Sequence, residues 1–84
     1  MKAKYVIYDD GNNYISIIFP SHVDHFLMVP KNCEIHSAGF VQLYVDENKN
    51  VNIDAYGKSV SLKIGTNNES TRLLQQMLRI GEYY

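Results

Sequence analysis

The sequence has only one cysteine and lacks any long apolar run. A single thiol, at Cys33, cannot form a disulfide within the chain. Together with the lack of a secretory leader pattern, this predicts a reducing, cytoplasmic setting. No apolar stretch approaches the ~20 residues that cross a bilayer, so a membrane-spanning chain is not expected. The net charge of −1 gives no general attraction for nucleic acid or anionic lipid.

Motifs for cofactor binding and catalysis are also missing. Gly11 stands alone in its turn, so there is no glycine-rich phosphate or dinucleotide loop. The acidic pairs Asp9-Asp10 and Asp46-Glu47 fall in predicted turns, where carboxylates cap backbone groups. Cys33 has no identifiable base with an orienting partner, which a cysteine nucleophile requires. The sequence therefore favours a protein that is not an enzyme and that carries no cofactor.

What the chain does contain is material for one core. It has 84 residues, of which 45% are apolar, and these include seven tyrosines and three phenylalanines. Disorder is disfavoured by this composition, and the length suits a single domain over residues 1–84. A core of this size leaves a thin margin of stability, which self-association would increase. We therefore expect a homo-oligomer.

Two sets of strands are indicated by the pattern of apolar residues. Lys4–Tyr8 and Tyr14–Phe19 are rich in β-formers and flank a dense turn, so they predict a central hairpin. Strict alternation over residues 41–46, 51–56 and 59–64 then predicts a three-stranded meander with one buried and one solvated face. Gly39 and Gly57 are expected at bulges or bends.

Two helices complete the predicted fold. A short one, about Ser21 to Met28, would bury Val23, Phe26 and Leu27 and leave the neighbouring histidines outside. The second would begin at the capping-box spacing of Thr66-Asn67-Asn68-Glu69 and end at Gly81. The prediction is an α+β fold in the order ββαβββα, with a mostly antiparallel five-stranded sheet and two helices.

Two segments carry a resemblance. Ser37-Ala38-Gly39-Phe40-Val41, followed by Tyr56-Gly57-Lys58-Ser59-Val60-Ser61-Leu62 and a C-terminal Leu-Leu helix, resembles a group of short uncharacterised bacterial and phage proteins with an SAGFV and a YGxSxSL pattern. The match covers roughly half of the chain, and Gly65-Thr66-Asn67-Asn68 departs from the arginine-containing segment expected there. The resemblance implies a phage or mobile-element setting and transfers no site residue.

One alternative function is a zinc site. All three histidines and the cysteine fall close together in the sequence, as His22, His25, Cys33 and His36, and these are residue types that zinc prefers. The paired spacings are generic, however, and Pro30 interrupts the segment. Surface histidines and a half-buried thiol are the competing interpretation.

The main hypothesis is a binding surface on the solvated face of the meander. That face would display Phe40, Gln42, Tyr44, Asp54, Tyr56 and Lys63, and the terminal Tyr83 and Tyr84 would add two further rings. Aromatic and hydrogen-bonding side chains together are typical of interfaces. Stacked bases of a single-stranded nucleic acid are an alternative occupant, but Asp54 and the shortage of lysines make nucleic acid an unlikely partner.

The sequence thus predicts a small, non-enzymatic binding module that uses a polar and aromatic surface. Its partner would be a second copy, another protein such as a host factor, or a small ligand. Cross-strand pairs that only stabilise the sheet are the competing interpretation of the same residues.

Overall fold

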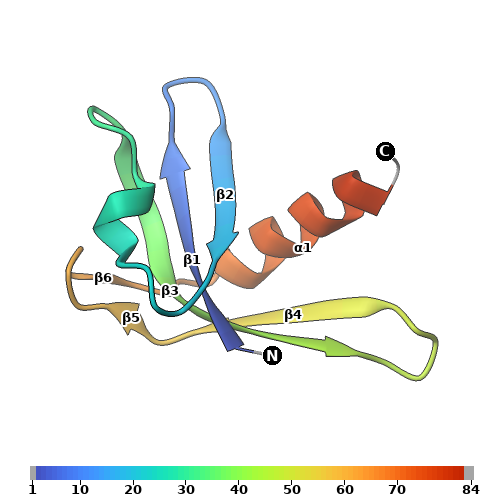
Figure 1. The fold of residues 1–84 in the computed structure, drawn as a ribbon. Coiled ribbons are helices and arrows are strands. Elements are labelled where there is room, and N and C mark those ends of the chain that lie inside the picture. The colour runs from blue at the N-terminus through green and yellow to red at the C-terminus, as the bar shows by residue number, and fades with distance from the viewer. Residues whose placement is uncertain (1, 83–84) are drawn as a thin grey trace.

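The computed structural model describes residues 2–82 as a mixed α+β fold built on a four-stranded antiparallel sheet (Figure 1). The order across the sheet is β2-β1-β3-β4, and β5 and β6 form a separate hairpin. The elements are β1 (Lys2–Asp9), β2 (Tyr14–Phe19), the 3-10 turn η1 (His25–Met28), β3 (Glu34–Val45), β4 (Val51–Tyr56), β5 (Lys58–Ser59), β6 (Ile64–Gly65) and α1 (Ser70–Glu82).

The sheet is buried on both faces around β1. Tyr5 and Ile7 point to one face and pack with Leu74 of α1, whereas Val6 and Tyr8 point to the other. The second face is covered by the segment around η1 and by the β5–β6 hairpin, which contributes Leu62 and Ile64. This arrangement explains why β1 is apolar at successive positions. The sequence placed β2 centrally as well, but it forms an edge of the sheet.

The predicted hairpins are confirmed, and the predicted fifth sheet strand is wrong. β1 pairs with β2, and β3 pairs with β4, in antiparallel register. Residues 59–64 do not continue the meander, because the chain bends at Gly57 (φ 73°) and turns back at Lys63 (φ 56°). The alternation there belongs to a short hairpin in which Ser59 is buried and Val60 is 80% exposed. The predicted faces are therefore reversed for Ser59 and Val60, whereas Leu62 and Ile64 pack against the core as predicted.

The predicted first helix is only one 3-10 turn. Asp24, at its N-cap, makes no side-chain capping bond, and Val29 directly after the turn is already extended, so no α-helix forms between Ser21 and Met28. The apolar stripe expected there is wrong at Phe26 and Leu27, although Val23 packs against the core as predicted. His25 is 4% exposed, while Phe26 and Leu27 are 52% and 64% exposed. His25 is buried in place of these apolar residues because its ring forms a hydrogen bond with the backbone carbonyl of Gly39.

The C-terminal helix is confirmed, with its cap displaced by one residue. The backbone N–H of Glu69 donates to Asn67 Oδ1, and the backbone N–H of Asn67 donates to Ser70 Oγ, each over 2.9 Å. This reciprocal pair is a capping box centred on Asn67. Thr66, the predicted cap, instead bonds the hydroxyl of Tyr5 over 2.8 Å. The helix continues through Gly81 to Glu82, so it does not end where the glycine predicted.

Within residues 2–82, no helix is both long and apolar enough to cross a membrane.

The chain at Tyr56 and Gly57 passes very close to the backbone of β3 at Gly39, and we call this place the crossing. A Cβ at this position would be 2.6 Å from the carbonyl oxygen of Tyr56 and 2.9 Å from Thr66 Oγ1. The Gly39 carbonyl also accepts a 2.7 Å hydrogen bond from the Nε2 of His25. Only glycine fits this crossing, because the nearest of these atoms belongs to backbone that cannot turn aside.

We therefore expect Gly39→Ala to lower the free energy of unfolding by about 1–3 kcal/mol, the usual cost of forcing an extra carbon into packed structure. Gly65→Ala is the matched control. Its added Cβ would meet nothing closer than Lys58 Cβ at 3.3 Å, which requires a displacement of only a few tenths of an ångström, so we expect a loss under about 1 kcal/mol. Urea denaturation of both variants checks this, and equal losses would contradict the crossing as the cause.

Candidate binding surfaces

The outer parts of β3 and β4 form a two-stranded ribbon that extends beyond the rest of the sheet (Figure 1). The described part of β1 starts at Lys2, which pairs with Gln42. Further along β3, Leu43, Tyr44 and Val45 pair with Ile53, Asn52 and Val51 of β4. We define the ribbon as residues 40–56. One face of the ribbon packs on the core through Val41 and Ile53, whereas the other face carries the exposed Tyr44, Asp54 and Tyr56 and is open to a partner.

Three cross-strand pairs line one face of the ribbon. Phe40 lies opposite Tyr56, Gln42 opposite Asp54, and Tyr44 opposite Asn52. The Phe40 and Tyr56 rings are stacked, with centroids 5.9 Å apart and planes 26° apart. Tyr44 and Tyr56 are 46% and 41% exposed. Five of the predicted surface residues, Phe40, Gln42, Tyr44, Asp54 and Tyr56, are thus brought together on one face.

Of the other predicted surface residues, Lys63 is not on this face. Lys63 is in the turn of the β5–β6 hairpin, with a positive φ, and not on a meander strand. Tyr83 and Tyr84 lie outside the described residues. The exposed surface of the ribbon is therefore narrower than the sequence predicted.

Charge on the ribbon is mainly negative. Asp46, Glu47 and Asp54 are its carboxylates, and Lys49 is its only cation. Asp54 is exposed and lies between the exposed rings in the register, two residues from Tyr56 and diagonal to Tyr44. Such a setting suits a cation better than a phosphate.

The tip of the ribbon is held by one carboxylate. Asp46 Oδ1 accepts hydrogen bonds from the backbone N–H groups of Asn48 and Asn50, and its Oδ2 accepts one from the Asn52 amide. The bonds from the Asn50 backbone and then the Asn52 side chain hold the pKa of Asp46 below its ordinary value of 3.8. The turn is ordered before any partner arrives, which lowers the entropic cost of binding.

A hollow of about 340 Å³ adjoins the ribbon at Phe40. Its other walls include His25, Lys4 and Lys58. The Phe40 ring meets the ring of His25 edge-on, with centroids 5.9 Å apart. Lys4 Nζ donates to the carbonyl of Val23, so that ammonium is already engaged. The hollow extends the aromatic face toward η1.

The four predicted zinc ligands serve separate purposes. His25 is buried and bonds Gly39, and because a carbonyl only accepts, its Nε2 carries the proton. The ring of His36 lies tilted against that of Tyr14, with centroids 4.5 Å apart, and its Nε2 is 3.9 Å from Glu69 Oε1. His22 is exposed and Cys33 is half-buried. In the described part of the chain, no three histidine, cysteine or acidic residues form a group that could hold a metal ion.

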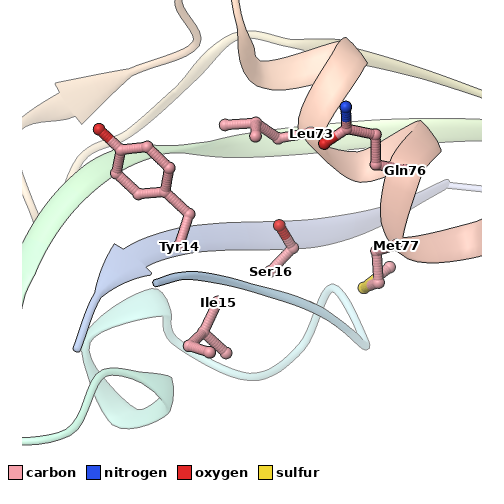
Figure 2. A pocket seen from close by; sticks show the side chains of 6 residues that line it. All are labelled: Tyr14, Ile15, Ser16, Leu73, Gln76 and Met77. Atoms are coloured by element: carbon pink, nitrogen blue, oxygen red, sulfur yellow. The ribbon is translucent and has the colours of Figure 1, made fainter. Parts of the chain in front are cut away.

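A second surface, which the sequence did not indicate, is a groove of about 300 Å³ between β2 and α1 (Figure 2). Tyr14 and Ser16 point from β2 toward Leu73, whereas Ile15 points to the opposite side. Gln76 and Met77 line the helical wall. The absence of charge in residues 14–19 is the one feature of the sequence that could have indicated this groove. It could not be interpreted without the strand order, which only the tertiary structure gives.

Comparison with protein-family models, with curated proteins and with solved structures found no match. Function is therefore inferred from this chain's own geometry.

Removing the carboxylate of the ribbon tip tests its ordering role. In Asp46→Ala, we expect the amide protons of Asn48 and Asn50 to exchange faster with solvent, since they lose their acceptor. Because folding lowers the pKa of Asp46, the carboxylate stabilises the turn at pH values above 3.8. That contribution is lost as the pH falls through the still lower pKa of the folded state.

Asp10→Ala is the reciprocal control, because Asp10 accepts from the backbone of Asn12 and Asn13 in the other hairpin turn. It should speed exchange there and leave Asn48 and Asn50 unchanged. Hydrogen exchange followed by NMR makes both measurements, and unaltered protection in Asp46→Ala would show that the turn is ordered by other contacts.

Proposed function

We propose that this protein is a non-enzymatic binding module whose ribbon captures a partner protein by a segment containing arginine. The observation that carries the proposal is the placement of an exposed carboxylate, Asp54, among exposed aromatic rings on one projecting face.

The chemistry of that face selects the partner. A guanidinium can pair with the Asp54 carboxylate while its plane lies against a tyrosine ring, which an ammonium does less well. Tyr44 and Tyr56 would bury much area at a small cost in rotamer freedom. Gln42 supplies an amide for the backbone of the partner, and Asn52 supplies its amide oxygen, because the Asn52 nitrogen already donates to Asp46 and Asn50. These groups support recognition of a short protein segment.

A polynucleotide fits the ribbon less well. Stacking on Tyr44 and Tyr56 is available, but three carboxylates against one lysine would repel a phosphate backbone. A small cationic ligand would use the same contacts as an arginine side chain, and the experiment below separates it from a peptide.

A displayed library of random short peptides tests the proposal, because such a library requires no choice of partner in advance. Selection on the immobilised protein should enrich peptides that contain arginine. Binding of a selected peptide should fall at least about tenfold in Tyr56→Ser, the scale of a central aromatic contact. Asp54→Asn, which removes the charge and keeps the shape, should abolish the preference for arginine over citrulline at the same position.

Tyr14→Ser is the matched control, because Tyr14 is similarly exposed, at 48%, but lies on the opposite edge strand β2. It should leave peptide affinity unchanged. Selected peptides that bind Tyr56→Ser as tightly as the wild type would refute the proposal. Binding of free arginine amide as tight as that of the peptide would replace the protein partner with a small ligand.

A further inference from the structure

The two edges of the sheet differ in how their outward backbone groups are satisfied. On β4, the N–H of Ala55 donates to Thr71 Oγ1 over 3.1 Å, and the carbonyl of Ile53 accepts from Gln75 Nε2 over 3.2 Å. Both side chains come from α1. The helix therefore closes this edge with its own hydrogen bonds, one of the ways in which proteins prevent unwanted strand pairing.

The β2 edge has no such cover. The N–H of Asp10 donates to the carbonyl of Asn13, so these two residues form a hydrogen-bonded pair next to the turn. Hydrogen-bonded and non-hydrogen-bonded pairs alternate along an antiparallel ladder. It follows that Tyr14, Ser16 and Ile18 direct their N–H and C=O groups away from β1. Within residues 2–82, no other segment donates to or accepts from these outward groups.

The sequence of β2 does nothing to discourage pairing. Residues 14–19 read YISIIF, without a charge or a proline, and their pairing with β1 has no bulge. Charges, prolines and bulges are the usual protection of an exposed edge. An uncharged, isoleucine-rich edge with unpaired backbone groups is a site for strand addition.

We propose that β2 pairs with β2 of a second copy of this chain, antiparallel, with the two-fold axis at Ser16. A two-fold axis normal to the sheet keeps α1 on the same side in both copies, so residues opposite each other must come from the same face. Ser16 then faces Ser16 of the second copy, and Tyr14 faces its Ile18. Because the backbone groups of Ser16 point outward, the central pair exchanges two hydrogen bonds.

This register is self-complementary in shape, and it brings a carboxylate beside a group that can donate a hydrogen bond. The half-exposed Tyr14 ring comes beside a hollow of about 370 Å³ that is lined by Ala3 and Ile18 of the second copy. The acidic turn at Asp10 comes beside the end of β2 that leads to His22, which is exposed. Backbone bonds from Asn13 and then Asn12 lower the pKa of Asp10, so its carboxylate is charged at neutral pH.

The groove beside β2 leaves room for the added strand. Ser16, at the proposed axis, points into it between Leu73 and Met77 (Figure 2). Side chains of a second β2 on the α1 side would therefore meet open space and not the packed helix. The ribbon is at the other edge of the sheet, so this interface is independent of the proposed function.

A charge-pair experiment at Ser16 tests the register. In Ser16→Lys, two ammonium groups would face each other across the axis, and in Ser16→Glu two carboxylates would do so. Each variant alone should dimerise about fivefold or more weakly than the wild type in sedimentation equilibrium. An equimolar mixture of the two should regain the dimer, because opposite charges then face each other.

Three controls separate the outcomes. Ser61→Lys adds the same charge at an exposed site on the β5–β6 hairpin and should not change dimerisation. Chemical synthesis of the chain with an N-methyl group on Ser16 removes only the outward donor, which tests the interface if the lysine variant does not fold. Tyr44→Ser alters the ribbon and should leave the dimer intact.

A wild-type monomer at the highest accessible concentration would overturn the proposal, as would a Ser16→Lys protein that dimerises normally. If Tyr44→Ser abolished the dimer and Ser16→Lys had no effect, the dimer interface would be on the ribbon, and the proposed pairing of β2 would be wrong. Peptide capture by the ribbon would survive either of the first two results, because neither of them places a second copy on the ribbon, so the two proposals fail separately.

Discussion

The structure depends on the buried middle of β3. There, hydrogen bonds attach α1 on one face of the sheet and η1 on the other. On one face, Ser70 Oγ donates to Ser37 Oγ over 2.9 Å and ties the start of α1 to the sheet. On the other, His25 bonds the carbonyl of Gly39 and ties down η1. Both serines and His25 are buried, so losing a partner would leave a polar group unsatisfied at a cost of about 1–3 kcal/mol. Gly39 makes room for the backbone that crosses at Tyr56. Residues 37–41 and 56–62 are thus in contact.

This attachment also explains the shape of the binding surfaces. One half of β3 is held between layers, and the other half leaves the sheet with β4 as a ribbon stiffened by Asp46 at its tip. The edge strand β2 is separated from the ribbon by β1 and β3. Because the two surfaces are at opposite edges, a second copy on β2 would not occupy the face that we propose for a partner protein. Dimerisation would then present two ribbons at once, and a bivalent partner would bind more tightly than a monovalent one.

Part of the fold and of the ribbon face could be predicted from the sequence, and the predictions that were wrong have identifiable physical causes. The ladder from Phe40 to Tyr56 was predicted correctly because strict alternation leaves one register that buries Val41 and Ile53. The same alternation misled after Gly57, where a positive φ bends the chain and places Ser59 inside. His25 was expected to be exposed because its neighbours have helical spacing. Its burial depends on a carbonyl fourteen residues away, which no local pattern reveals.

The sequence by itself determined the α+β class, both hairpins, the C-terminal helix and the five ribbon residues on one face, since each follows from local periodicity and turn chemistry. The tertiary structure decided which strands form the edges, which edge α1 closes, and that no three of the described metal-ligating residues meet as a metal site. These properties arise from contacts between segments far apart in the chain. A strand such as β2 has the same sequence whether a neighbour covers it or not, so only the assembled fold shows that its edge is open.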